Sequence, residues 1–517
     1  MLLIWIFCFT FLLVRAELDE SRDLVLKHLK MFTNVDEPAC SNLHRHVCPR
    51  ENSTKKLWTE RNRIEKTMYG RMSLYPTIPR MLPVFKDIKL LARHDRISLF
   101  TKISSNLCRY NSSDERRFFV ETIQKAFAMS HLDMSPFYTD PDCERASMHL
   151  KDFTLGRDFT INRYVVDVLH NLYGINGIMQ SYELLLSPPF TELRNFTAST
   201  LGKMKSKLRS WIEKTPWVEN NNAKVSYLKF VEHIRLAEDD PVLAVARTTF
   251  IKMNDEHILC KSRLGESKSN VSELLCSLAL FTENFGVVWS VHELFLRSEL
   301  RIPIMGANRR SNAGNFHPHL YFDSQFLLLA NTDEYAIQMG SLGSVVGHEL
   351  SHSVIENYGI DKGLPYFSES TRQCILDQFN ATCAEFKEVS CDTRKEQINE
   401  DGADILGFQL AYELTKEYYG EKFDDTYEEL GVTYKQLFFL SSATNFCKDD
   451  NSQIILTPDG KDTHSVDNIR ENVYAQQIDD FPVAFNCKAE DRMIRSKTRT
   501  CHPFGPEAFA QRRIINE

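Results

Sequence analysis

Residues 345–354 read VVGHELSHSV, which places two histidines four residues apart and a glutamate directly after the first. In an α-helix, residues four apart project from the same face, so His348 and His352 can present ring nitrogens to one metal ion. Glu349 would lie beside that ion, close enough to take a proton from an attacking water without being a ligand. The pattern predicts a zinc-binding helix. The alternative is a helix that carries two unrelated histidines.

A second segment, NEDGADILGF at 399–408, offers two carboxylates at the same helical spacing. Catalytic zinc usually takes three protein ligands, and Glu400 could be the third. Asp404, one turn later, could accept a hydrogen bond from the far nitrogen of a ligating histidine and hold its orientation. Alone, such a pair is more often part of a solvated face. The histidine pair upstream favours the ligand interpretation.

A third segment, KDTHSVDNIRENV at 461–473, contains His464 and, six residues later, Arg470. Hydrolysis of a peptide bond requires a donor for the developing oxyanion and a group that holds the substrate backbone. These two residues could supply both. A lone histidine and arginine in a loop are more often surface residues, so their value depends on the other two segments.

The N-terminus, MLLIWIFCFTFLLVRA, has an apolar run from Leu2 to Val14 followed by a small residue, Ala16. This run has the length of a signal-peptide core and is shorter than the roughly 20 residues that span a bilayer. We expect cleavage after Ala16, with an uncleaved anchor as the alternative. After signal removal, we expect no transmembrane span.

Cysteine usage also favours an oxidising compartment. The chain has 13 cysteines, and loss of Cys8 with the leader leaves 13 − 1 = 12, an even number that suits a disulfide framework. Five glycosylation acceptors of the N-x-S/T type point the same way. Together these features predict a secreted, disulfide-bonded glycoprotein. The acceptors are Asn52, Asn111, Asn195, Asn270 and Asn380.

Helical spacing dominates the chain of 517 residues, for example at 22–32, 161–175, 272–296 and 404–420. The segment at 319–329 is the best strand candidate. We therefore predict a predominantly α-helical α+β protein with a small sheet near the histidine pair. The formal net charge of −8 provides no basic surface for nucleic acid, so nucleic-acid binding is not expected.

The three segments resemble the neprilysin and endothelin-converting-enzyme family of zinc endopeptidases. Members show V-x-G-H-E-x-x-H, then E-N-x-x-D, then D-x-H-S-P with an arginine six residues after the histidine. This chain has VVGHELSH, EDGAD and DTHS, with Arg470 at the same offset. SNAGNF at 311–316 resembles the family's N-A-Y-Y segment, and the family's C-x7-C and A-F-x-C elements match at 39–48 and 482–487. The ordered match runs from Cys40 to Cys501.

The resemblance implies a zinc endopeptidase that cuts oligopeptides on the amino side of hydrophobic residues. Its partners would be peptide substrates, its cofactor one Zn²⁺ per chain, and its oligomeric state stays open. It also implies a role for each matched residue: zinc ligands His348, His352 and Glu400; general base Glu349; positioning residue Asp404; oxyanion donor His464; substrate-binding residues Asn312, Ala313 and Arg470.

The same resemblance suggests disulfide pairs, although spacing alone does not determine connectivity. The family pattern pairs Cys40 with Cys487, Cys48 with Cys447, Cys108 with Cys276 and Cys374 with Cys501. For the remaining four cysteines we expect Cys383 with Cys391 and Cys143 with Cys260.

The implied architecture is a thermolysin-like zinc peptidase domain with a small sheet and a second helical lobe that is reduced in length. We expect a signal peptide at 1–16, an N-terminal segment at 17–75 that packs on the catalytic domain, the second lobe at 76–275 and the catalytic domain at 276–517. A shortened lobe could leave the cleft open to larger substrates, or could leave the cleft incompletely supported.

Several positions depart from the family pattern. Gly314 and Asn315 replace the two tyrosines, SVIEN at 353–357 replaces G-F-D-D, and Val466 and Phe504 replace a proline and a tryptophan. Because this segment is one residue longer, Glu356 or Asn357 would not reproduce the usual carboxylate there. These departures keep open a catalytically inactive, secreted peptide-binding homologue. A third possibility is a peptidase with the same zinc ligands that is unrelated to this family.

Overall fold

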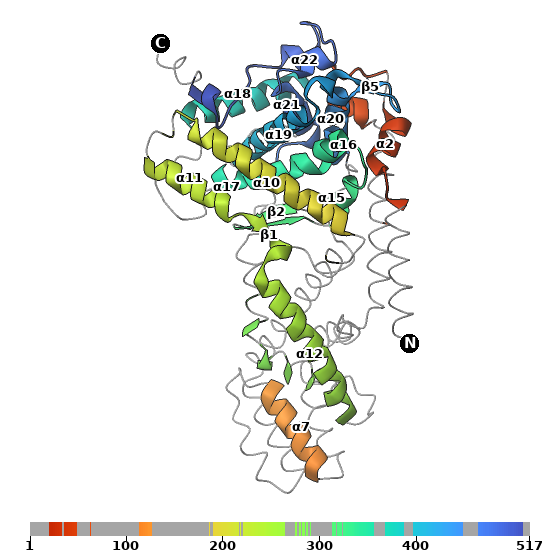
Figure 1. Cartoon of the computed structure of the whole chain (residues 1–517), viewed down its shortest axis with the longest axis vertical. Coiled ribbons are helices and arrows are strands. Elements are labelled where there is room, and N and C mark those ends of the chain that lie inside the picture. Colours follow the sequence, from red (N-terminus) through yellow and green to blue (C-terminus); the bar gives the residue numbers. More distant parts are fainter. Residues whose placement is uncertain are drawn as a thin grey trace. The chain divides into compact units, whose positions relative to one another are not determined.

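A computed structural model describes residues 20–33, 36–48, 113–126, 190–216, 221–263, 313–316, 318–322, 324–355, 368–386, 397–447 and 464–509, together with scattered positions that include 63, 186, 218 and several between 275 and 290. Its main helices, labelled as in Figure 1, are α2 (Leu24–Phe32), α3 (Leu43–Val47), α7 (Ser113–Ala126), α10 (Thr191–Glu213), α11 (Asn221–His233), α12 (Pro241–Arg263), α15 (Ser324–Leu329), α16 (Tyr335–Gln338), α17 (Ser344–Ile355), α18 (Glu369–Phe386), α19 (Ile398–Tyr419), α20 (Tyr434–Ala443), α21 (Asp467–Gln476), α22 (Phe481–Ala484) and α23 (Arg492–Arg495). The strands are β1 (Arg235–Leu236), β2 (Ala313–Phe316), β3 (His319–Phe322), β4 (Thr426–Tyr427) and β5 (Val432–Thr433).

The described chain is therefore predominantly helical with small sheets, as the helical spacing predicts. In the three-stranded sheet, β3 lies in the centre, parallel to β1 and antiparallel to β2. Asn315 of β2 stands opposite Leu320 of β3. β2 is thus an edge strand of this sheet, and it packs against α17, the helix that carries the histidine pair.

The chain divides into two compact units. One consists of Met1–Arg71, Leu185–Ala237 and Ser311–Glu517, and the other of Met72–Leu184 and Glu238–Arg310. This division differs from the boundaries expected from the sequence. In particular α10, which we assigned to the second lobe, packs on α17 and α19 of the first unit, as Figure 1 also shows.

Helices α17 and α19 cross at a pair of glycines. A Cβ atom on Gly347 would lie 2.4 Å from the backbone oxygen of Gly407, and a Cβ atom on Gly407 would lie 2.2 Å from the backbone nitrogen of His348. Only glycine allows two helix backbones to approach so closely. The crossing brings the histidine turn of α17 directly against the first turns of α19.

A buried aromatic cluster supports α19 from behind. Phe408 and Tyr412 of α19 contact Phe438 and Phe439 of α20, with ring centroids 5.2–6.1 Å apart. Aromatic side chains bury large areas and hold fixed relative orientations. The cluster therefore provides a rigid support for the face of α19 that carries Phe408 and Tyr412.

Two of the four helical segments expected from periodicity fall on described residues and are helices. Helix α2 lies within 22–32, and α19 covers 404–419 but begins earlier, at Ile398; Gly420 follows it with a φ of 54°. Segment 161–175 lies outside the described residues, and 272–296 is described only in part.

The strand expected at 319–329 is wrong after residue 322. His319–Phe322 is strand β3, but Ser324–Leu329 is helix α15. Leu327, Leu328 and Leu329 are all buried. A continuous apolar run looks the same in a buried strand and in a buried helix, which explains the error.

Three of the expected disulfides are confirmed: Cys40–Cys487, Cys48–Cys447 and Cys374–Cys501. The first two join the N-terminal segment to α20, α22 and their surroundings, across 447 and 399 residues of sequence.

Two expected disulfides are wrong, because Cys260 bonds with Cys276. This pair closes only 16 residues and excludes both Cys108–Cys276 and Cys143–Cys260. Cys383 is disulfide-bonded, whereas its expected partner, Cys391, lies outside the described residues. Among the described helices, none is both long and apolar enough to cross a membrane.

Candidate metal centre

Three side chains expected to bind zinc converge at the crossing of α17 and α19. The Nε2 atoms of His348 and His352 are 3.0 Å apart. Oε2 of Glu400 lies 3.3 Å from the first of these nitrogens and 3.4 Å from the second. Four-coordinate zinc with ligands at about 2.0–2.2 Å requires ligand atoms about 3.3–3.6 Å apart. The three atoms thus form a triangle close to one face of a zinc tetrahedron.

The carboxylate of Glu400 provides a separate test of whether a cation fits. Its Oε2 atom is buried and faces the Nε2 atoms of His348, His352 and His464 at 3.1–3.4 Å. A carboxylate surrounded by imidazole nitrogens is a donor set typical of a zinc site. Although burial acts the other way, the neighbouring His464 and His352 hold the pKa of Glu400 well below its ordinary value. The site therefore suits a divalent cation.

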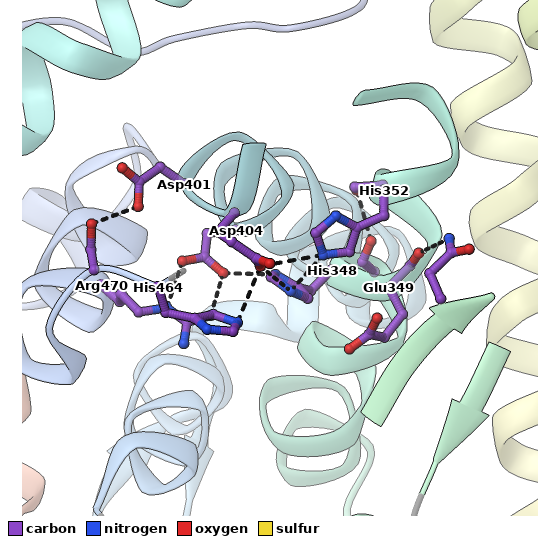
Figure 2. A network of polar contacts seen from close by, with 12 residues as sticks. His348, Glu349, His352, Asp401, Asp404, His464 and Arg470 are labelled. Atoms are coloured by element: carbon purple, nitrogen blue, oxygen red, sulfur yellow. Dashed lines mark hydrogen bonds and ion pairs between the residues drawn. The ribbon is translucent and has the colours of Figure 1, made fainter. Parts of the chain in front are cut away.

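Asp404 contacts the far nitrogen of His348. The Nδ1 atom of His348 lies 2.7 Å from Oδ1 of Asp404, while its Nε2 atom faces the other ligands (Figure 2). Such a carboxylate fixes the tautomer of a metal-binding histidine. The structure thus places the far nitrogen of His348, not that of His352, on Asp404.

Asp404 is fully buried and is held by two further side chains of α21. Arg470 donates from Nε and Nη2 to its two oxygens, each at 2.7 Å. Tyr474 donates from its hydroxyl to Oδ1 at 2.6 Å. Burial alone would raise the pKa of Asp404, but Arg470 and His348 hold it below its ordinary value. Asp404 is therefore an ionised anchor for His348.

Arg470 was expected to grip a substrate carbonyl. It is only 7% exposed, and its Nε and Nη2 donors are used on Asp404. The contact that the structure gives for Arg470 is thus a positioning contact, and the grip on a substrate stays a prediction.

Glu349 lies beside the three ligands without being one of them in this triangle. Figure 2 shows Glu349 on α17, next to His348, and Glu349 is 6% exposed. Burial raises the pKa of its carboxyl, although His348 and His352 act in the opposite direction. A carboxylate whose pKa is raised towards neutrality suits a group that takes up and returns a proton.

His464 reaches the same centre from the segment before α21. Its Nε2 atom lies 3.1 Å from Oε2 of Glu400, and Gln397 donates to its backbone carbonyl at 2.8 Å. The neighbouring Ser465 donates to the buried carboxylate of Asp401 at 2.7 Å. His464 therefore stands at the edge of the candidate metal centre, and its role as an oxyanion donor stays a prediction.

The expected substrate-binding segment is described only from Ala313 onwards. Ala313 begins the edge strand β2, whereas Asn312, Glu356 and Asn357 lie outside the described residues. Sequence reasoning assigned no role to Asn315, whose Nδ2 atom donates to the backbone carbonyl of Glu349 at 2.5 Å and to Oγ of Ser353 at 2.8 Å. No sequence signal links residues so far apart.

Tyr474 was also missed. It lies four residues after Arg470 on α21, so the spacing that relates His348 to His352 could have identified it as a neighbour of Arg470. Asp401, directly after Glu400, was missed for a different reason. A second carboxylate at the start of a helix is ordinarily a solvated residue.

Comparisons with known proteins point to one family. Residues 324–501 match the model of "Peptidase family M13". The chain is 26% identical to Neprilysin-3 of Drosophila melanogaster over 172 residues, which are 31% of this chain and 21% of that protein. It is also 26% identical to Endothelin-converting enzyme-like 1 of Homo sapiens over 193 residues, which are 35% of this chain and 24% of that protein. The matched region thus spans less than a quarter of each of these relatives.

Among solved structures, the crystal structure of the Mycobacterium tuberculosis zinc metalloprotease ZMP1 with an inhibitor is similar at a TM-score of 0.42. The sequence identity is 15%, and the match covers 69% of this chain and 55% of that chain. At this level the similarity adds no argument about the site.

Proposed function

We propose that this chain, a divergent member of peptidase family M13, is a secreted, zinc-dependent endopeptidase that hydrolyses oligopeptides on the amino side of hydrophobic residues. The observation that carries the proposal is the triangle of His348, His352 and Glu400, with separations of 3.0–3.4 Å and with Glu349 beside it. The preference for hydrophobic residues rests on the family resemblance.

His348, His352 and Glu400 would hold the zinc ion. When bound, zinc supplies a Lewis acid that polarises the scissile carbonyl and lowers the pKa of the attacking water. Glu349 accepts the proton of this water and later passes it to the leaving amine. His464 donates to the oxygen of the scissile carbonyl as negative charge develops there. Asp404 keeps His348 in the orientation that directs Nε2 towards the ligand triangle.

The edge strand provides a place for the peptide. Among the described strands, β2 pairs with β3 alone, and it packs against α17. An extended peptide can add to such an edge through main-chain hydrogen bonds. Asn312 and the backbone of Ala313 would hold the substrate there, next to Glu349.

Secretion is supported by the four disulfides among the described residues. Disulfides of this kind form in oxidising compartments. Asn195 and Asn380, two of the expected glycan acceptors, are exposed on α10 and α18. Both would be accessible to glycosylation on a secreted chain.

The test is turnover of a peptide mixture, followed by mass spectrometry with and without a chelator. The wild-type protein is expected to produce fragments that begin with hydrophobic residues, and the chelator is expected to stop their formation. Glu349→Gln should lower turnover by about 10²–10⁴-fold while bound zinc stays at one per chain, because only proton transfer is lost.

Glu417→Gln is the matched control, since Glu417 lies on α19 with its side chain 56% exposed. Its turnover should equal that of the wild type. Full turnover in Glu349→Gln would exclude the assignment of the base. Peptide binding without fragments in the wild type would instead favour the inactive, peptide-binding homologue.

A further inference from the structure

Two departures from the family pattern meet in space. The second tyrosine of N-A-Y-Y is Asn315 in this chain, and the glycine after the second histidine is Ser353. They are 38 residues apart in sequence, yet Nδ2 of Asn315 donates to Oγ of Ser353 at 2.8 Å.

The same amide reaches the catalytic turn. Nδ2 of Asn315 also donates to the backbone carbonyl of Glu349 at 2.5 Å. Glu349 and Ser353 are one helical turn apart, so both acceptors lie on the turn of α17 that contains the proposed base and His352. Asn315 is 9% exposed and Ser353 is 2% exposed. Because water has little access to these groups, the bonds are stronger than they would be at the surface.

We infer that Asn315 and Ser353 are positioning residues that hold the substrate-binding edge β2 in register with the catalytic turn of α17. The inference rests on the proposed function, because it assigns the edge strand to peptide binding. Asn315 is two residues from Ala313 on the same strand, so a shift at Asn315 moves the peptide relative to Glu349 and the metal ligands. Misplacement by about 1 Å is enough to lower reactivity by about 100-fold.

The test compares two ligands of the zinc-loaded protein by calorimetry. Acetohydroxamate contacts the metal centre alone, whereas a tripeptide phosphonate contacts the metal centre and the edge strand. Asn315→Ala should lower the affinity for the phosphonate by about tenfold to a hundredfold, because the substitution removes both hydrogen bonds. Binding of acetohydroxamate should change by less than about threefold, since the ligand triangle is untouched.

Ser353→Ala is the milder variant, since it keeps the bond to the carbonyl of Glu349 and should weaken the phosphonate by about threefold to tenfold. The double variant should bind the phosphonate within about twofold of Asn315→Ala, because Ser353 has then lost its strand partner. The inference would be overturned if Asn315→Ala lost the same affinity for acetohydroxamate as for the phosphonate, or lost affinity for neither. It would also be overturned if the affinity losses of the two single variants added up in the double variant.

The proposed function fails by a different result. If the wild-type protein binds both ligands but cleaves no peptide, the peptidase assignment is lost, while the ratio of the two affinities in Asn315→Ala still decides the role of the amide. If the wild type binds neither ligand, the metal centre and the inference fall together.

Discussion

The ligand side and the strand side of the candidate site are held by contacts of different kinds. On the ligand side, the ionised Asp404 is buried against Arg470, Tyr474 and His348. On the strand side, Asn315 makes two neutral hydrogen bonds to α17. Buried charges are costly to separate, whereas neutral bonds tolerate replacement. The ligand side is therefore the less replaceable of the two, and two of the departures from the family pattern, Asn315 and Ser353, meet on the strand side.

The largest effect is expected from removal of a ligand. Glu400→Ala takes away one corner of the ligand triangle and should lower zinc affinity by more than about 100-fold, beyond what loss of an outer contact costs. Zinc content after dialysis, measured by mass spectrometry, checks this. Glu417→Ala, on the same helix and exposed, should retain zinc as the wild type does. Retained zinc in Glu400→Ala would contradict the ligand assignment.

A large loss of stability is expected from Arg470→Met. The change leaves the buried carboxylate of Asp404 without its charged partner, which should cost about 3–5 kcal/mol of the free energy of unfolding. Urea unfolding at pH 7 measures this. Because the pKa of Asp404 is lowered in the folded state, its contribution is present above the unfolded value of about 4 and is lost only as the pH falls through the lower folded value.

The contribution of Asp404 to the stability of the wild type should accordingly be the same at pH 7 and pH 5. In Arg470→Met, burial without the guanidinium raises the pKa of Asp404, so the loss should shrink as the pH falls. A loss that grows from pH 7 to pH 5 would mean that Asp404 is not held ionised by this pair.

A smaller effect, specific to the ligand side, is expected from Tyr474→Phe. It removes one hydrogen bond to Asp404 and should cost about 1 kcal/mol of stability and up to about tenfold in zinc affinity. Tyr412→Phe is matched, because the Tyr412 hydroxyl donates to Asp480 at 2.7 Å. It should lose similar stability but no zinc affinity. Equal zinc affinities in the two variants would remove Tyr474 from the support of the centre.

Local periodicity accounts for what could be predicted about the site. His348 with His352, and Glu400 with Asp404, are pairs one turn apart on α17 and α19, and the sequence showed them as such. The change from strand to helix within 319–329 could not be predicted, because an apolar run has no period that distinguishes a buried strand from a buried helix. The disulfide Cys260–Cys276 was missed because cysteine spacing does not determine connectivity.

The sequence by itself determined the types and spacing of the proposed metal-binding and acid–base residues, since these follow from 3.6 residues per turn within single helices. Only the tertiary structure decided which residues meet across helices. The close crossing at Gly347 and Gly407 places Glu400 against His348 and His352, and the packing of β2 on α17 joins Asn315 to Ser353. These contacts join residues far apart in sequence, and helix periodicity has no information about them because it is local.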